Sequence, residues 1–139
     1  MSVGIEAIRS ALELALFGLD VTPFPTAWEN KEFKPTVGTA HQRVFFMPLQ
    51  PDNPTMGATH YRERGMMRVT LAYPNDGKGA QASARRAESL RGLFARGASF
   101  SDSGITVRID RTAQVHQGRA LDGWWLTDVD IFWFADIFN

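Results

Sequence analysis

The hydrophobic and polar positions between residues 65 and 94 predict a strand, a tight turn and a helix in direct succession. Apolar and polar side chains alternate over residues 67–73, which is the period of a half-buried strand. The next six residues are rich in Pro, Asn and Gly, which favour turns. One helical face then carries Ala80, Ala84, Ala87, Leu90 and Phe94. Because a strand that leads into a helix packs that helix across its own sheet, we expect the other segments to complete and cover this sheet.

Earlier in the chain, apolar residues at helical spacing predict a first helix over residues 3–17. A short candidate strand follows at residues 26–30. Residues 43–49 are predicted to form another strand, and Pro48 indicates that it lies at an edge or at its own end. Two loops flank this strand, at residues 31–41 and 50–59.

The second half of the chain continues with a turn over residues 97–104, a strand over 105–109, a loop over 112–123 and a last strand over 124–135. The last two strands follow one another directly, which favours a hairpin. The expected order is α-β-β-β-α-β-β. It predicts one α+β domain over residues 1–139, with a two-layer, mainly antiparallel β-sheet and two helices packed on one face. The face of the last strand expected to be apolar carries Thr127, Val129, Ile131 and Trp133.

Composition narrows the function classes. The chain has 139 residues, of which 44% are hydrophobic and 22% charged, as in an ordinary soluble domain. It has no cysteine, which excludes disulfides and thiolate metal sites. Its formal net charge is zero, whereas a dedicated nucleic-acid binder normally carries a basic excess. No apolar run reaches the roughly 20 residues needed to cross a bilayer, and the first residues lack a signal-peptide layout. We expect a cytoplasmic protein that contacts neither nucleic acid specifically nor membrane.

A phosphate-binding loop is the first chemical candidate, because Gly77, Lys78 and Gly79 lie between a predicted strand and helix. The full P-loop pattern needs a glycine where Ala72 stands and Ser or Thr where Gly79 stands. A plain strand-to-helix turn is therefore favoured over a nucleotide site.

Titratable residues give no stronger signal. The three histidines, at positions 41, 60 and 116, are far apart, and we expect them to be solvent-exposed and not to form a zinc site. Asp128 and Asp130 share one strand face and could form a catalytic carboxylate pair. Their apolar neighbours, Leu126 and Phe132, favour the half-exposed face of an outer strand or the contact of that strand with a neighbour. We predict no catalytic residue, metal site or cofactor.

Interaction surfaces are the remaining possibility. Arg85 and Arg86 are expected to be solvated on the central helix, whereas Arg91 lies at the border of its apolar stripe. Arg91 could extend its stem along that stripe towards solvent or could bind a neighbouring subunit. Phe132 and Phe134 lie in a strand that is apolar on both faces near its end, so loops or another subunit must cover one of those faces.

Residues 25–35, with Trp28, Glu29 and Asn30 followed by Phe33 and Pro35, resemble the opening of the phage tail terminator-like proteins. Later segments match the same family in order, and the resemblance covers nearly all of the chain after the first helix. These segments lie at residues 43–44, 49–51, 56–57, 64–65, 73–74, 77–79, 87–94, 107–109 and 122–125.

The resemblance implies a structural protein of a phage or prophage virion, located in the tail and assembled in the bacterial host cytoplasm. Related terminators form a ring, usually a hexamer, on the finished tail tube. The ring stops tube polymerisation and presents a surface to head-completion proteins. The family brings no catalytic residues and no cofactor. Another head–tail joining or tail-completion protein is one alternative, and a small nucleotide- or ligand-binding enzyme using residues 77–79 is a second.

The resemblance also singles out one segment. We expect Trp28, Glu29 and Asn30, together with the two long loops, to meet the neighbouring subunit or the tube, or to brace the loop that does. The alternative for Trp28 is an ordinary buried core position.

Overall fold

The computed structural model describes residues 4–57 and 59–138 and contains two helices and eight strands. The helices are α1 (Gly4–Phe17) and α2 (Gly79–Leu93), so the expected start of the first helix at Val3 lies outside the described residues. The strands are β1 (Thr26–Ala27), β2 (His41–Pro48), β3 (His60–Pro74), β4 (Ser99–Asp102), β5 (Ile105–Ile109), β6 (Gln114–Val115), β7 (Arg119–Leu121) and β8 (Trp124–Phe138).

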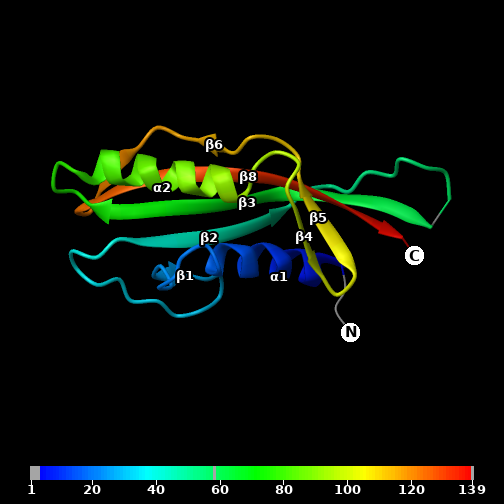
Figure 1. The fold of residues 1–139 in the computed structure, drawn as a ribbon, viewed down its shortest axis with the longest axis horizontal. Helices are drawn as coiled ribbons and strands as arrows, with labels where there is room; N and C mark the ends of the chain where they lie inside the picture. Colours follow the sequence, from blue (N-terminus) through cyan, green and yellow to red (C-terminus); the bar gives the residue numbers. More distant parts are fainter. Residues whose placement is uncertain (1–3, 58, 139) are drawn as a thin grey trace.

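The long strands β3 and β8 form the centre of the sheet (Figure 1). The strand order is β1-β2-β3-β8-β5-β4, and β6 and β7 also pair with β8. Only the β1–β2 pairing is parallel among the described strands. β3 and β8 pair along their whole length, from His60 opposite Phe138 to Pro74 opposite Trp124. The prediction of an α+β fold with a mainly antiparallel sheet is confirmed.

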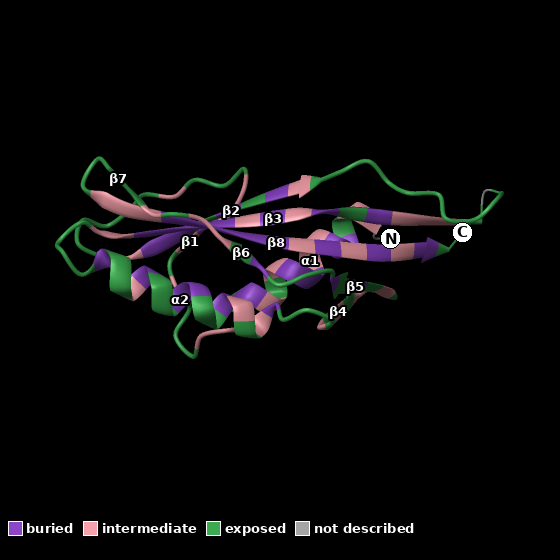
Figure 2. Cartoon of the chain, turned by 90° about the horizontal axis from the view of Figure 1, so that it is seen from above, coloured by how far each residue is buried: buried purple, intermediate pink, exposed green. Residues whose placement is uncertain are grey.

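Successive side chains of β3 and β8 point to opposite faces of the sheet, so one face of each strand is buried and the other is more accessible. The face of β8 predicted to be apolar is indeed buried, from Thr127 to Trp133. Both helices lie on the same side of the long strands (Figure 2), and their buried residues belong to the same core cluster. The core includes Ile8, Leu12, Leu16, Met67, Val69, Leu71, Leu90, Phe94, Val129, Ile131 and Trp133.

Three short strands were missed by the sequence analysis, so the expected order of elements was incomplete. β4 lies inside the expected turn over residues 97–104 and forms a hairpin with β5. Its turn consists of Ser103 and Gly104, both with positive φ (52° and 79°), as a tight two-residue hairpin requires. β6 and β7 lie inside the expected loop over residues 112–123. Strands of two to four residues are too short to show a period in the sequence.

Two other expectations need correction. β5 and β8 are antiparallel neighbours, but they pair only through Arg108 with Phe134 and Ile109 with Trp133. β8 is therefore an inner strand of the sheet, between β3 on one side and β5, β6 and β7 on the other. The strand expected over residues 26–30 is only two residues long, and shortly beyond its end Asn30 takes a left-handed conformation with φ of 60°.

Gly65 is the position where the backbone of β3 most needs a glycine. A Cβ atom there would lie 2.5 Å from both the Met47 carbonyl oxygen and Cζ2 of Trp133. The Trp133 ring lies over this position and stacks on Phe46, with ring centroids 5.2 Å apart. Gly65 thus allows the largest buried side chain of the core to lie flat against the sheet.

We predict that Gly65→Ala lowers the free energy of unfolding by about 2–3 kcal/mol, because the added methyl group must displace backbone and Trp133. Gly92→Ala is a matched control, since a Cβ atom at Gly92 would meet nothing within 4 Å. It should raise stability by about 0.5–1 kcal/mol by favouring the helix. Urea unfolding measures both changes, and equal stability of the two variants would contradict this account of Gly65.

Candidate interaction surfaces

The side of the sheet opposite the helices carries no helix of the described chain (Figure 2). Cross-strand rows run across it, such as Phe45–Arg68–Asp130 and Met47–Met66–Phe132. We call this surface the bare face. Its accessible residues are Arg43, Phe45, Met47, Arg62, Arg64, Met66, Arg68, Leu126, Phe132 and Phe134.

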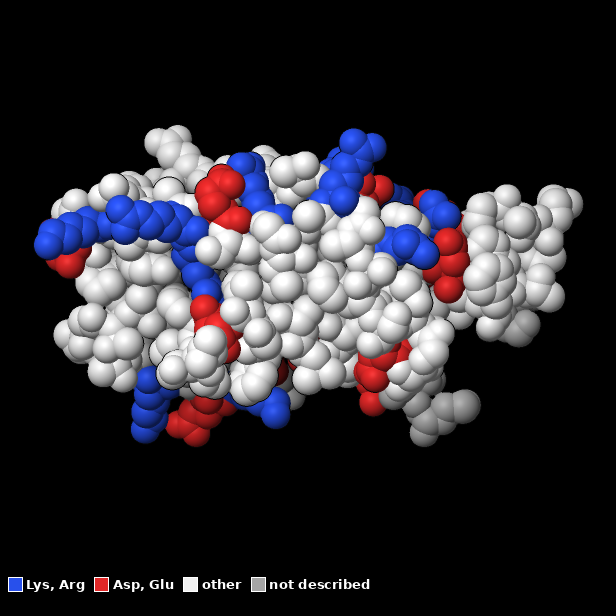
Figure 3. Space-filling view, in the orientation of Figure 1, with Lys and Arg blue, Asp and Glu red and all other residues white. Residues whose placement is uncertain are grey.

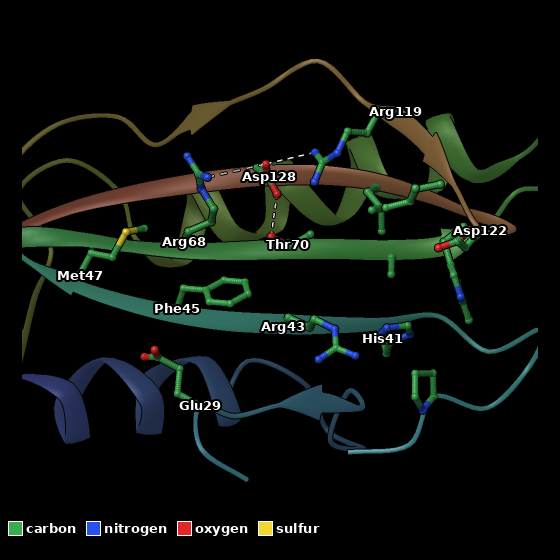
Figure 4. A pocket seen from close by; sticks show the side chains of 15 residues that line it. Glu29, His41, Arg43, Phe45, Met47, Arg68, Thr70, Arg119, Asp122 and Asp128 are labelled. Carbon is green, nitrogen blue, oxygen red and sulfur yellow. Dashed lines mark hydrogen bonds and ion pairs between the residues drawn. The ribbon is translucent and has the colours of Figure 1, made fainter. Parts of the chain in front are cut away.

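A groove of about 690 Å³ occupies the part of the bare face nearest β7. Figure 4 shows Arg43, Phe45 and Met47 projecting into it from β2, with Arg119 of β7 on its far side. A second groove of about 370 Å³ lies farther along β3 and β8. The bare face is therefore an uneven surface on which apolar and charged side chains alternate.

A network of charged groups crosses the middle of this face. Arg68 binds Asp130 with both ends of its guanidinium, Nε to Oδ1 at 2.7 Å and Nη2 to Oδ2 at 3.0 Å. His116 Nε2 lies 2.7 Å from Asp130 Oδ2. The other carboxylate, Asp128, accepts a bond of 2.6 Å from the Thr70 hydroxyl and one of 3.1 Å from Arg119 Nη1. Both aspartates are thus fully engaged in holding strands together.

The expected position of this aspartate pair on an outer strand is wrong. Asp130 is only 3% exposed, because β6 and the segment before β7 pass along β8 and cover it. Burial acts against its charged form, but hydrogen bonds from Arg68 and His116 outweigh burial, and the pKa of Asp130 is lowered. A carboxylate held ionised by two partners is a poor proton acceptor, which disfavours a general-base role.

The histidines were also wrongly expected to be solvent-exposed. His41 is buried beside the Trp124 ring, and burial lowers its pKa. His60 lies 3.0 Å from an Asp136 oxygen, and His116 contacts Asp130. Each histidine lies in a strand or beside one, where its partner comes from a distant segment. Within residues 4–57 and 59–138, no group of three His, Asp or Glu side chains could hold a metal ion.

Phe132 and Phe134 lie in the second groove, and an arginine covers each ring. The guanidinium carbon of Arg111 is 5.1 Å from the Phe132 centroid, and that of Arg62 is 4.6 Å from the Phe134 centroid. Asp136 fixes Arg62 through two hydrogen bonds of 2.9 and 3.1 Å. The cover over these rings is thus polar and solvent-facing. Arginine together with aromatic rings is a common composition of protein–protein contacts.

A third groove, of about 460 Å³, lies between α1 and the segment after β1. We call it the Trp28 groove. It is lined by Arg9, Ser10, Glu13, Leu14, Phe17, Trp28, Glu29 and Lys31. Trp28 is half-buried: it packs against the core and also lines the groove, and its contact with a partner stays a prediction.

Glu29 braces the strand edge next to this groove. Its Oε1 atom accepts the Phe46 backbone N–H at 2.6 Å and an Arg9 N–H at 3.1 Å. Phe46 lies in β2 beyond the point where β1 ends, so its N–H has no strand partner on that side. The carboxylate supplies the missing acceptor and blocks further strand pairing at this position. Asn30 then reverses the chain in its left-handed conformation.

One of the three α2 arginines differs from its predicted role. Arg86 was expected to be solvated, but it is 8% exposed and donates to Asp20 at 2.7 Å and to Gln42 at 3.2 Å. Arg91 donates to the Ala113 carbonyl at 2.9 Å and so joins α2 to the segment before β6. Arg85 is exposed, as expected.

The glycine loop before α2 is already occupied by a carboxylate. Asp76 Oδ1 accepts the Lys78 backbone N–H at 2.9 Å, at the start of the helix where a phosphate would bind. Gly77 has a φ of 88°, which only a turn glycine adopts easily. The geometry is that of a strand-to-helix turn. Within the described part of the chain, no helix has the length and apolar character needed to span a bilayer.

Comparison with known proteins identifies the family of the chain. The model of a family described as phage tail terminator protein matches residues 7–133, which is most of the chain. One solved structure aligns with a TM-score of 0.81 over 99% of both chains at 21% sequence identity, a likeness that supports the fold alone. No curated protein sequence matches the chain.

We predict that Asp130→Asn lowers the free energy of unfolding at pH 7 by about 2 kcal/mol, because Arg68 loses a charged, buried partner. Since the folded-state pKa of Asp130 is lowered, its contribution is complete above the unfolded-state value of 3.8 and is lost as the pH falls through the folded-state pKa. The difference between wild type and variant should therefore shrink under acid. Urea unfolding at pH 7 and pH 3 tests this, and a pH-independent difference would argue against it.

Glu29→Ala should destabilise the fold by about 1–2 kcal/mol, because the Phe46 N–H loses its acceptor. Glu29→Gln is the matched control, since its amide oxygen can still accept that N–H while the ion pair with Arg9 is lost. We expect most of the stability to return in Glu29→Gln. If both variants lose the same stability, the ion pair and not the strand-edge bond is the important contact.

Proposed function

Because the chain belongs to the phage tail terminator family, we propose that it caps the finished tail tube, ends tube polymerisation and forms the surface to which head-completion proteins bind. Its role in completing a phage tail is structural. In this proposal it acts as a ring of identical subunits, with six as the expected number, in the tail of a phage or prophage virion assembled in the host cytoplasm. Its partners are copies of itself, the tail tube protein and a head-completion protein, and it uses no cofactor.

The observation that carries this proposal is the family match over residues 7–133. The surfaces support it physically. A closed ring needs one surface of each subunit to fit a different surface of the next, and a cap needs further surfaces for the tube and the head. The groove on the bare face and the Trp28 groove adjoin at Glu29, which lines both, and each has a mixed apolar and charged lining.

An enzymatic function is less well supported. The carboxylates on the bare face are bound by arginine, histidine and threonine side chains, and Asp76 fills the start of α2. We therefore favour the structural role over nucleotide or ligand turnover. Another head–tail joining role would use the same kinds of surface, and the length of the tail tubes distinguishes it from termination.

Deleting the gene from the encoding phage or prophage should give tail tubes of abnormal length and unjoined heads, because nothing stops tube growth. Electron microscopy of lysates measures both features. Complementation with the wild-type gene should restore uniform tails. Tubes of normal length beside unjoined heads would instead indicate a joining role, and intact virions would contradict both.

A further inference from the structure

We infer that the Trp28 groove of one subunit receives the outer face of α2 from a second copy of this chain. This inference rests on the proposed ring and assigns two of its surfaces. Three properties of the described residues carry it: the apolar wall of the groove, the incomplete charge pairing at its rim, and the composition of the α2 surface.

The wall of the groove exposes large apolar side chains on α1. Leu14 is 65% exposed and Phe17 is 55% exposed, and both lie beside Trp28 in the same groove. Adjacent exposed residues of this size on a folded domain mark a contact surface. Because the groove lies between a helix and a loop, it suits another helix laid along it.

The rim of the groove carries two carboxylates, Glu13 and Glu29, and two cations, Arg9 and Lys31, but Lys31 makes no ion pair with any residue that the structure describes. Arg9 Nη1 lies 3.1 Å from Glu29 but 3.9 Å from Glu13, so Glu29 holds it more closely. Burial, with a smaller contribution from the negative charge of Glu29, raises the pKa of Glu13, although the positive charges of Arg9 and Lys31 act in the opposite direction. An incoming guanidinium would complete the pairing of Glu13.

The outer face of α2 offers such a cation. Arg85 is exposed, and its guanidinium has no ion pair or hydrogen bond with any residue that the structure describes. Ser89 and Gly92 follow it on the same face at helical spacing. Glycine in a helix costs about 1 kcal/mol relative to alanine, and the packing of the described residues does not require one at Gly92. Glu88 is exposed beside them and pairs with Arg91 at 3.1 Å, so the small residues Ser89 and Gly92 leave space on this face between charged side chains for the exposed Leu14 and Phe17 of a neighbour.

The positions of the two surfaces suit a closed ring. α1 lies on the β2 side of the long strands and α2 on the β8 side (Figure 1). In the same view, basic side chains lie over the α2 end of the molecule and also elsewhere on this face, interspersed with acidic ones (Figure 3). A contact between α1 of one copy and α2 of the next uses each surface once per subunit, which is the condition for a closed ring.

Disulfide cross-linking tests the contact directly, because the chain has no cysteine of its own. We expect the double variant Leu14→Cys, Ser89→Cys to form a ladder of covalent oligomers on tail tubes, ending at the ring size. A mixture of the two single variants should give only a covalent dimer. Leu14→Cys combined with Met56→Cys is the control, since Met56 is fully exposed in the loop before β3 and lies outside the inferred contact.

Charge reversal gives an independent test with substitutions at the surface. Glu13→Arg or Arg85→Glu alone should weaken ring formation at least tenfold in native mass spectrometry or light scattering, and the two together should restore most of it. Circular dichroism verifies that each variant folds.

The outcomes separate the inference from the proposed function. If wild-type rings cap tubes but the double-cysteine variant gives no ladder, the inferred contact is wrong and the function stands. If Glu13→Arg leaves rings intact but abolishes tube binding, the tube occupies the groove, and the inference is again overturned. If the wild type neither forms rings nor binds tubes, the proposed function is wrong, and the inferred contact, which rests on it, is wrong as well.

Discussion

The antiparallel pairing of β3 with β8 is the constraint on which the rest of the structure depends. Each strand has 15 residues, and they pair from end to end. Their alternation sends Val69 and Val129 to the helices and Arg68 and Asp130 to the other side. One ladder thus determines both the core and the composition of the bare face.

The bare face is accessible to solvent, yet several of its charged side chains already pair with one another. Arg68 and Asp130 neutralise one another, and arginines cover the rings of Phe132 and Phe134. Such a surface stays compatible with water while the subunit is alone. It can also contact a partner without leaving a buried charge unpaired, which would be costly. These properties suit a subunit that must be stable before and after assembly.

The sequence predicts the long elements well and the polar contacts poorly. The helix α2 and the end of β3 near Pro74 have strong periods and lie close to their predicted bounds, whereas β3 begins at His60, well before the alternation over residues 67–73. β6 and β7 were missed, because two or three residues carry no period and their pairing depends on β8. The burial of Arg86 could not be predicted either, since Asp20 lies 66 positions away in the chain.

In the segment around Trp28, too, the sequence indicated the position of the segment but not its polar contacts. Its resemblance to the terminators identified Glu29 as a residue of interest, and the structure shows why: its carboxylate completes the hydrogen bonding of β2 at Phe46. No local pattern contains that contact, because Phe46 is 17 residues away. Motifs therefore located the important segment, and the fold explained what the segment does.

We propose that this protein is an assembly component whose surfaces bind copies of itself and a tail tube. Electron microscopy of purified tail tubes, incubated with the purified protein and averaged at their ends, tests it most directly. The account predicts an added ring at one end of each tube and none along its length. Bare tube ends in the presence of excess folded protein would contradict it.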